Sequence, residues 1–453
     1  MNKFKESESL DDILSSWQSV LDTVQAAPGQ DVYTALKEKS YEIFWCRQLF
    51  QDIEKKRQHS DYDVPASNKN IVVIGAGPAG LLTAIECRML GANVHVIEKR
   101  NYITRNNILH LWPFTVDYLK SLAAKVFYSK FGTGSINHIG TKYLQRILIK
   151  ISLLIGINLN FGVEFLSKQN EGNKISINSN PSLQLPPIDI LVGADGDGSV
   201  IVKEFEFSHA KKETFINVSL GITFNFVNNH SKEEMQLREF AISRQFAKDY
   251  FQSLKDKYGI DLENLVYYRG ETHYFVMTPT KESLLNRQVF ISNEDTTSQL
   301  ISSNNISMDK LLSYVRDVAN VVGIPESCEI EQTHTQSPDV AIFDFSRSKK
   351  TDEVVKVFFP QLVALVGDAS LAPFWPQGTG CNRALLSALD TAWMFREIIS
   401  KGKEDAQSLQ DIVDQRAKSF TKMRTSLAES IRPFTKTSLN PDSRYGNGFT
   451  GIY

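Results

Sequence analysis

Cysteine is scarce in this chain, and long uninterrupted apolar stretches are missing. Only four cysteines occur among 453 residues, and none stands close enough to another for a metal-ligand or redox-pair motif. We therefore expect buried, reduced thiols in place of a disulfide framework, and we predict no metal site. No stretch approaches the roughly 18 apolar residues of a membrane-spanning helix, and the start MNKFKESESLDD lacks the apolar core of a signal peptide. These absences predict a cytoplasmic protein without membrane insertion.

An excess of charge of either sign is also missing. The 50 basic and 52 acidic side chains give a net charge of −2, which offers no overall attraction to nucleic acid or to anionic membranes. Hydrophobic residues at 42% and charged residues at 23% are typical of a globular protein. Because the chain is longer than a single hydrophobic core usually allows, we expect two or three lobes.

The periodicity of apolar residues changes several times along the chain. Helical spacing dominates the start, strands and helices then alternate, shorter strands follow, and the last part is helical again. The alternating part favours a parallel sheet with crossover helices. This predicts five segments: an N-terminal helical segment and linker (1–66), a first part of an α/β domain (67–160), a mainly β domain (161–360), a second part of the α/β domain (361–400), and a C-terminal helix and tail (401–453).

A glycine-rich turn follows the first buried strand, within NIVVIGAGPAGLLTAIECRMLGANVHVIEKR. Gly75 permits a tight turn, Gly77 lets the backbone approach a pyrophosphate, and Gly80 lets helix and strand pack closely. The first helical turn, which contains Ala79, offers free N–H groups and a positive dipole end to the phosphates. Glu98 ends the next strand, where a carboxylate can hold ribose hydroxyls. The pattern predicts a dinucleotide site and leaves FAD and NAD(P) both open.

A second apolar strand ends in a Gly-Asp pair, within LVALVGDASLAPFWPQGTG at 362–380. Asp368 can accept hydrogen bonds from a ribityl hydroxyl, and the helix that follows would point its positive end at a flavin. Gly378 and Gly380 let the backbone approach a ring beside which Phe374 or Trp375 can lie. A Gly-Asp pair alone is more often a plain turn, but together with the upstream glycines it favours FAD.

A third strand, DILVGADGDGSV at 189–200, ends in Asp195 and Gly196 and is expected to return to the FAD domain. This Asp-Gly pair resembles that of single-component flavoprotein hydroxylases such as p-hydroxybenzoate hydroxylase, which receive a nicotinamide cofactor without a second Rossmann fold. The chain has no second G-x-G-x-x-G, which agrees; an ordinary polar turn is the alternative. The predicted fold class is α/β (α+β), with a Rossmann-type FAD domain, a β-rich substrate domain, and N- and C-terminal helices.

Several longer motifs resemble the monooxygenase domain of the MICAL family. They are RNNILHLWPF directly after the second Rossmann strand, GIDLENLVYYRGETHYFVMT, SPDVAIFDF, the strand, loop and following residues at 362–394, and NPDSRY. The resemblance implies an FAD-dependent monooxygenase with NADPH as electron donor, NADH not being excluded. It also implies a protein substrate, with actin as the candidate, oxidised at methionine sulfur to the sulfoxide. No calponin-homology or LIM region is recognised in these residues.

The resemblance also implies roles for individual residues. Glu98, Arg100 and Arg105 would bind the cofactor, with the first two at its adenosine end. Asn107 and Trp375 would lie at the active face of the flavin, and Tyr274 and Phe374 would line the same cavity. His110 and His273 have the chemistry of acid–base catalysts but receive no catalytic role, because flavin monooxygenation needs little such help.

One departure from the family pattern leaves the nicotinamide cofactor open. Asp197 and Gly198 follow the Asp-Gly turn where the family tends to have basic residues, and an acid near a 2′-phosphate would weaken NADPH selection. Three alternative functions also stay open. They are a small-molecule aromatic hydroxylase of the same fold, an NAD(P)H oxidase that releases hydrogen peroxide, and a non-catalytic binding module that retains FAD.

Overall fold

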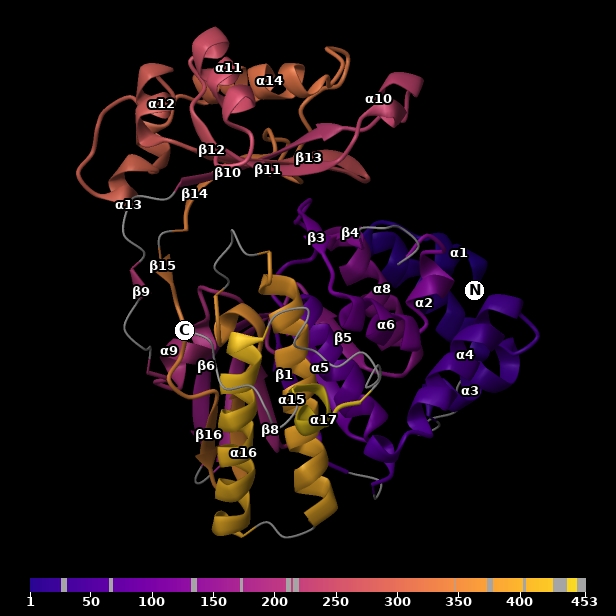
Figure 1. Ribbon diagram of the computed structural model, residues 1–453. Coiled ribbons are helices and arrows are strands. Elements are labelled where there is room, and N and C mark those ends of the chain that lie inside the picture. The colour runs from indigo at the N-terminus through magenta and orange to yellow at the C-terminus, as the bar shows by residue number, and fades with distance from the viewer. Residues whose placement is uncertain are drawn as a thin grey trace.

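The computed structural model describes residues 1–25, 31–64, 68–131, 137–171, 174–208, 213–214, 220–345, 347–372, 378–401, 405–426 and 438–445. They form a large lobe and a smaller lobe, which lies above it in Figure 1. The large lobe contains the N-terminal helices, the first sheet and the last helices of the chain. Within these ranges, no helix combines the length and the apolar character needed to cross a membrane.

A six-stranded sheet forms the centre of the large lobe, in the order β16-β17-β8-β1-β2-β5. All neighbouring strands are parallel except β16 and β17. The strands are β1 (Asn70–Ile74), β2 (Asn93–Glu98), β5 (Asn158–Phe161), β8 (Ile190–Gly193), β16 (Val355–Phe358) and β17 (Gln361–Leu365). The order places β8 between β1 and β17. The carboxyl ends of these three parallel strands, which are far apart in the sequence, therefore lie side by side.

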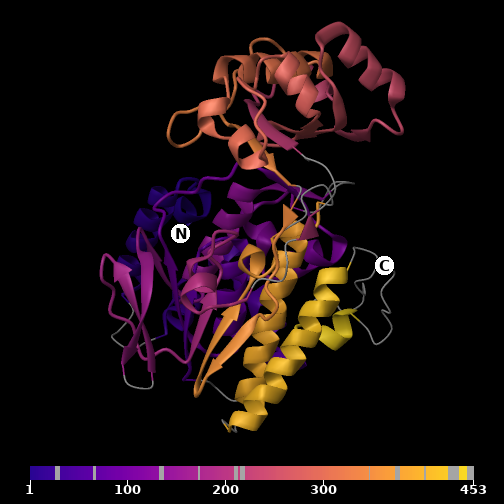
Figure 2. The ribbon, with the colours of Figure 1, turned by 90° about the vertical axis from the view of Figure 1, so that its left-hand side faces the viewer.

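The sheet has a hydrophobic core on each face, because side chains alternate along a strand. In β1, Ile71 and Val73 face the core beneath the helices, whereas Val72 and Ile74 face a second core. The first face is covered by α5 (Pro78–Met89), α8 (Thr141–Leu154) and α15 (Gly380–Lys401), and α16 (Ala406–Thr425) packs on α15. The second is covered by α9 (Val200–Glu204) and the hairpin of β6 (Glu164–Glu171) and β7 (Lys174–Asn180). Figure 2 shows the hairpin and α16 on opposite sides of the sheet.

Helices before the first strand complete the large lobe. They are α1 (Asn2–Glu6), α2 (Leu10–Val24), α3 (Val32–Ser40), α4 (Phe44–Arg57) and the 3-10 turn η1 (Ser60–Tyr62). Ser9 caps α2 by accepting a hydrogen bond from the Asp12 amide. The same face of α2 is buried at Leu10, Ile13 and Trp17, as the helical spacing predicts. Later helices of this lobe are α6 (Pro113–Ser121), α7 (Ala124–Phe127), η3 (Gly367–Ala369) and α17 (Pro441–Tyr445).

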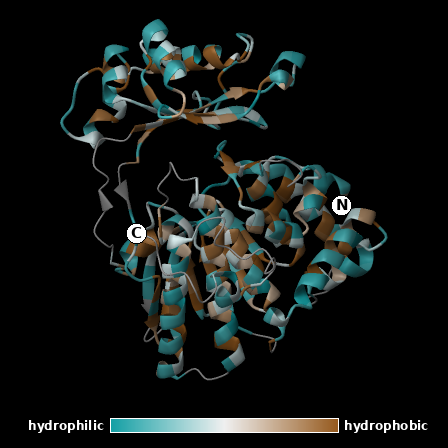
Figure 3. Ribbon diagram, viewed as in Figure 1, coloured by the Kyte–Doolittle hydropathy of each residue, from teal (hydrophilic) through white to brown (hydrophobic). Residues whose placement is uncertain are grey.

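The small lobe is built on a five-stranded antiparallel sheet, in the order β11-β12-β13-β10-β14. The strands are β10 (Leu220–Val227), β11 (Phe240–Ser243), β12 (Leu262–Arg269), β13 (Thr272–Pro279) and β14 (Val340–Asp344). Phe224 and Phe275 stack across neighbouring strands, with ring centroids 4.6 Å apart. Figure 3 shows the apolar colouring of these strands against the more polar helices around them.

The small lobe contains more helix than the sequence analysis expects for a mainly β stretch. Its helices are α10 (Lys232–Gln236), α11 (Lys248–Tyr258), α12 (Lys281–Asn286), α13 (Thr297–Leu300), η2 (Ser303–Asn305) and α14 (Met308–Val322). Between β10 and β12 the chain forms two of these helices, α10 and α11, with β11 between them. In α14, Leu311, Val315 and Val318 are buried at helical spacing, so the apolar pattern is present and indicates this helix.

Two short ribbons lie between the lobes. β9 (Glu213–Thr214) pairs with β15 (Arg347–Ser348), where the chain passes between the lobes. β3 (Ile108–His110) pairs with β4 (His138–Gly140), and this second ribbon reaches from the large lobe toward the small sheet. Ile108 shares a small hydrophobic cluster with Tyr274 and Val276 of β13. Residues of both lobes therefore meet at β3.

A buried charge cluster ties the last helix to the large lobe. Arg444 of α17 pairs with Asp390 of α15, and both side chains are fully buried. The Tyr445 hydroxyl donates to Asp390 at 3.1 Å, and the Leu439 amide donates to Asp61 at 2.6 Å. The motif NPDSRY is thus a structural anchor that joins the C-terminal residues to the N-terminal segment.

Candidate cofactor and active site

The glycines between β1 and α5 differ in what surrounds them. Gly75 has φ of +111°, and a Cβ there would overlap the carbonyl oxygen of Ala194, which follows β8. A Cβ at Gly80 would overlap the carbonyl oxygen of Gly75. A Cβ at Gly77 would meet nothing within 4 Å. Close packing therefore requires glycine at Gly75 and Gly80. Gly77 instead faces open space at the N-terminus of α5, where a phosphate can approach.

Glu98 connects the glycine turn to the end of β2. Its Oε2 accepts a hydrogen bond from the Ala76 amide at 2.9 Å, and its Oε1 accepts one from the Arg100 amide at 3.0 Å. A carboxylate has further acceptor positions, so Glu98 can also accept hydroxyl groups. The Arg100 side chain is exposed beside it.

The Gly-Asp pair after β17 lies against the first turn of α5. Gly367 has φ of +62°, and a Cβ there would lie 3.0 Å from the Cβ of Ala79. The Gly367 amide donates to the Ser387 hydroxyl of α15 at 2.8 Å. The glycine turn near the start of the chain and the Gly-Asp pair near its end are therefore brought together, as a site for one extended dinucleotide requires.

Asp368 is a half-buried carboxylate that lacks a protein donor among the residues that the structure describes. Across the described residues, no hydrogen bond or ion pair reaches its side chain. Burial raises the pKa of Asp368; the Arg105 guanidinium opposes this rise and the Asp197 carboxylate adds to it. An unpaired carboxylate at this depth is costly, so a ligand that offers hydroxyl or N–H donors would be favoured here.

Asp195 accepts hydrogen bonds from residues that follow it closely in the sequence. Its Oδ1 accepts the Ser199 hydroxyl at 2.6 Å, and its Oδ2 accepts the Val200 amide at 2.6 Å and the Ile201 amide at 3.2 Å. These bonds cap the N-terminus of α9. Asp197, which follows, forms an ion pair with Lys349 at 3.1 Å.

Asn107 and Tyr274 are in contact across the two lobes. The Asn107 side-chain amide donates to the Tyr274 hydroxyl at 3.0 Å, and the Asn107 carbonyl accepts the Thr141 amide and hydroxyl, each at 2.8 Å. Tyr274 is buried on the face of β13 that contacts Ile108. Burial is the largest cause that raises the pKa of Tyr274, so its phenol stays protonated at physiological pH.

We expect Tyr274→Phe to lower the free energy of unfolding by about 1 kcal/mol, because the Asn107 amide loses its acceptor. Tyr268→Phe is the matched control, since the Tyr268 hydroxyl makes no hydrogen bond within the described ranges. Urea unfolding of the three proteins measures the difference. Equal losses in both variants would mean that the Asn107–Tyr274 bond contributes nothing to stability.

Asn382 positions a segment beside the candidate site, and the sequence analysis misses it. It is buried in α15, where its Oδ1 accepts the Trp112 amide at 2.8 Å and the Thr115 hydroxyl at 2.9 Å. Its amide donates to the His110 carbonyl at 2.9 Å. Asn382 thereby fixes the HLWPF segment to the start of α15. The available signal was a polar side chain on the apolar face of an amphipathic helix.

Two predicted catalytic residues, Phe374 and Trp375, lie outside the described residues. Gly378 has φ of +59°, and Gly380 begins α15. Arg105 and His110 are exposed. His273 lies on the opposite face of β13 from Tyr274, buried against Tyr267 and Glu234.

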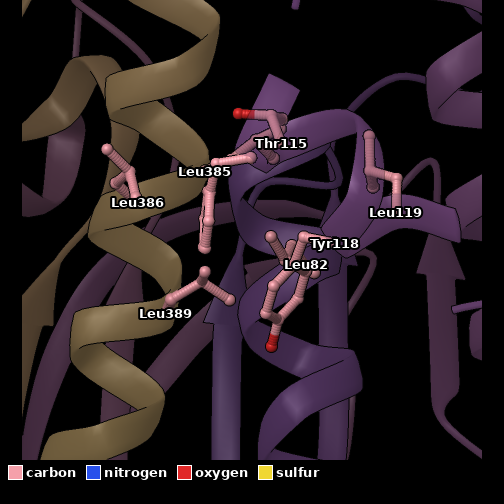
Figure 4. A pocket seen from close by; sticks show the side chains of 8 residues that line it. Leu82, Thr115, Tyr118, Leu119, Leu385, Leu386 and Leu389 are labelled. Carbon is pink, nitrogen blue, oxygen red and sulfur yellow. The ribbon is translucent and has the colours of Figure 1, made fainter. Parts of the chain in front are cut away.

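A small apolar cavity lies between α5, α6 and α15. It is lined by Leu82, Phe114, Thr115, Tyr118, Leu119, Leu385, Leu386 and Leu389, most of which Figure 4 labels. The lining is almost entirely apolar and offers no charged group. The cavity is therefore a gap in core packing and gives no catalytic chemistry.

Two family models match the chain. Residues 73–118 match the NAD(P)-binding Rossmann-like domain, and residues 218–344 match the model described as Mical, Rossman domain. The first match covers the glycine turn and Glu98. The second covers the small lobe, whose sheet is antiparallel in this structure.

Curated relatives extend the match over most of the sequence. The F-actin monooxygenase MICAL2 of Rattus norvegicus is 37% identical over 439 residues, which is 92% of this chain and 22% of that protein. This chain is related to the MICAL family. The protein-methionine sulfoxide oxidase mical3a of Danio rerio is 34% identical over 98% of the chain and 23% of its own length. The chain thus spans between 22% and 34% of the length of the MICAL relatives compared with it.

Solved structures share the fold at low identity. The anhydrotetracycline hydroxylase OxyS from Streptomyces rimosus has a TM-score of 0.53 and 13% identity, covering 82% of this chain and 70% of its own. The flavin-dependent halogenase CmlS has a TM-score of 0.54 and 13% identity, covering 85% and 68%. The predicted fold class, Rossmann-like α/β related to p-hydroxybenzoate hydroxylase, is confirmed for this MICAL relative.

The geometry of the MICAL-related chain fits FAD. Gly77 leaves room at the N-terminus of α5, and Glu98 retains acceptor positions. Asp368, beside the first turn of that helix, has no donor in the described part of the chain. The phosphates of FAD would fit the space at Gly77, its ribose hydroxyls would donate to Glu98, and its ribityl chain would donate to Asp368.

A substitution at Asp368 is expected to affect the stability of the FAD-free protein and the affinity for FAD in different ways. Because the pKa of Asp368 is raised on folding, the folded protein holds this proton more tightly than the unfolded chain. Stability of the FAD-free protein therefore falls as pH rises from the ordinary aspartate pKa through the raised one. We expect Asp368→Asn to remove this fall while weakening FAD binding by about 1 kcal/mol. Thermal midpoints across acidic pH and FAD titrations test it; identical pH profiles for the two proteins would contradict it.

Proposed function

We propose that this chain is an FAD-dependent monooxygenase that oxidises methionine sulfur of a protein substrate, with actin as the favoured target and NADPH as electron donor. The observation that carries the proposal is the pairing of a MICAL-like sequence with Asp368, a carboxylate that has no donor among the described residues and lies beside the open glycine turn. The actin target comes from the names of the relatives, which are F-actin monooxygenases. We assign FAD binding to 67–160, 361–400 and the strand at 189–200, and the substrate face to the part of 161–360 that forms the small lobe.

The proposed roles follow the contacts described above. Glu98 and Arg100 would hold the adenosine end, and the α5 N-terminus with Gly77 and Ala79 would hold the pyrophosphate. Asp368 would accept from the ribityl chain, with Arg105 near enough to moderate its charge. Asp195 would act indirectly, through the turn that it caps.

The reaction transfers one oxygen atom to sulfur. Bound FAD would supply electron transfer from the nicotinamide and activation of dioxygen. In the overall balance, NADPH, a proton, dioxygen and methionine give NADP⁺, water and methionine sulfoxide. The protein would orient the ring and exclude water, and we assign the Asn107–Tyr274 pair, together with Phe374 and Trp375, to the face where the thioether approaches. The sulfoxide is polar, so the product can disrupt a packed interface of the substrate.

The ion pair between Asp197 and Lys349 supports NADPH as donor. Asp197 is the acid that would repel a 2′-phosphate, and Lys349 balances its charge at 3.1 Å. NADH remains the alternative donor, and the ratio of kcat/KM for the two cofactors distinguishes them.

One experiment tests the function. FAD-loaded protein is mixed with NADPH and filamentous actin, and actin methionines are examined by mass spectrometry for one added oxygen. Asn107→Ala is the active-face control, and it should retain FAD while losing most oxidation of actin. NADPH consumption that actin leaves unchanged would instead indicate a peroxide-releasing oxidase. Stimulation by phenols and not by actin would indicate a small-molecule hydroxylase, and flavin that NADPH does not bleach would indicate a binding module.

A further inference from the structure

Three side chains of types that can ligate a metal converge in the small lobe, away from the proposed flavin site. They are Glu234 of α10, His273 of β13 and Cys328, which follows α14. All three are buried, and one ligand atom from each lies within 4.8 Å of the others. His273 Nε2 lies 3.0 Å from Glu234 Oε1, and Cys328 Sγ lies 3.2 Å from the same oxygen. α10, which carries Glu234, lies in the upper lobe of Figure 1, apart from α5 and α15.

Neighbouring groups hold these ligands in place. The Asn229 and Ser231 amides donate to the two oxygens of Glu234 at 2.8 and 2.7 Å, within a capping box. The Tyr267 hydroxyl lies 2.8 Å from His273 Nδ1, so Nε2 is the nitrogen directed at the cluster. The Asn229 side-chain amide lies 3.8 Å from Cys328 Sγ. Such outer partners orient ligands at metal sites and set the tautomer of a ligating histidine.

The separations are close to those of a tetrahedral zinc site. Bond lengths of about 2.0 Å to oxygen, 2.05 Å to nitrogen and 2.3 Å to sulfur place O and N about 3.3 Å apart, and O and S about 3.5 Å apart. The observed 3.0 and 3.2 Å are shorter by a few tenths of an ångström, a shift that side-chain rotation supplies. One carboxylate and one thiolate would neutralise a divalent ion in this buried place.

We propose that Glu234, His273 and Cys328 form a zinc-binding site that stabilises the small lobe. Binding of Zn²⁺ releases the thiol proton of Cys328 to solvent and leaves the His273 proton on Nδ1, which Tyr267 accepts. Water or the Asn229 amide oxygen completes the fourth position. The ion joins α10 and the segment after α14 to one face of β13, whose other face carries Tyr274. The site does not depend on the proposed function, because it lies on the opposite side of that strand.

Metal content and a cobalt spectrum test the proposal on the FAD-loaded full chain, purified without chelator. We expect about one zinc per chain by elemental analysis, and Co²⁺ added to zinc-stripped protein should give thiolate-to-cobalt absorption. Cys328→Ser keeps the size and a hydrogen-bond donor but should lose that absorption and weaken metal binding by more than about tenfold. Cys46→Ser is the matched control, because Cys46 is also buried but lies in α4 of the large lobe.

Several outcomes would overturn the site. Folded wild-type protein that carries no zinc and takes up no cobalt would show that the cluster is a hydrogen-bonded network only. Equal cobalt spectra for wild type and Cys328→Ser would place the metal elsewhere. If Cys328→Ser does not fold, X-ray absorption of the zinc in wild-type protein decides, since one sulfur ligand supports the site and none overturns it. FAD absorbance, recorded in parallel, reports separately on the flavin proposal.

Discussion

Gly77→Val is expected to give a folded protein that no longer holds FAD. Gly77 has φ of −71° and ψ of 172°, which other residues adopt without strain, and a Cβ there would meet no protein atom within 4 Å. The added methyl groups would instead occupy the space before α5 that the pyrophosphate needs. We expect FAD affinity to fall at least about 100-fold, which is about 2.7 kcal/mol. Flavin absorbance after purification and titration of FAD into apoprotein measure the loss.

Gly75→Ala is the informative control, because it should fail differently. Its φ of +111° is unfavourable for any side chain, and the new Cβ would overlap the Ala194 carbonyl. This variant should lose folded protein, whereas Gly77→Val should keep the circular dichroism and the unfolding transition of wild type. If Gly77→Val bound FAD as wild type does, the cofactor could not lie at the N-terminus of α5.

Arg444→Ala and Asp390→Ala are each expected to lower the free energy of unfolding by about 3–5 kcal/mol, because each leaves its partner as an unpaired buried charge. Arg444 and Asp390 are fully buried, and Tyr445 adds a hydrogen bond to the same carboxylate. The segment 438–445 would also lose its main anchor to α15. Urea unfolding, followed by intrinsic fluorescence, measures both variants.

A neighbouring exposed pair provides the comparison. Lys422 and Asp442 lie 3.0 Å apart, with Asp442 in the same short helix as Arg444 and its side chain 74% exposed. Lys422→Ala should therefore cost less than about 1 kcal/mol. The double variant Asp390→Leu with Arg444→Met should recover much of the loss, since it removes both charges together. Equal losses from the buried and the exposed pair would contradict the anchoring role of Arg444.

Local chemistry explains which site residues could be predicted from the sequence. The turn at Gly75, Gly77 and Gly80 and the acid at Glu98 lie within one strand–helix–strand unit, so their spacing alone indicates their geometry. Asn107 and Tyr274 are 167 residues apart, and only the family resemblance suggested that they share a site. Neither the hydrophobic pattern nor the secondary-structure propensity of a sequence predicts a contact between two lobes.

The missed features have different physical causes. Asn382 is a buried polar residue whose three hydrogen bonds go to a segment about 270 residues away. The residues near Asn382 in the sequence therefore do not predict these bonds. Helix α14 does carry an apolar pattern, but the strands around it dominated the interpretation of that stretch. Glu234, His273 and Cys328 come from a helix, a strand and a loop, and their wide spacing hides the cluster that folding creates.

The two hydrogen bonds that the Glu98 carboxylate accepts from backbone amides affect how a dinucleotide binds. One carboxylate holds the Ala76 and Arg100 amides, so the glycine turn and the end of β2 are preorganised before any ligand arrives. Little conformational entropy remains to be lost at this end of the site, and affinity gained there comes at small ordering cost. A nucleotide that lacks the flavin, such as ADP-ribose, should therefore compete for this end on its own.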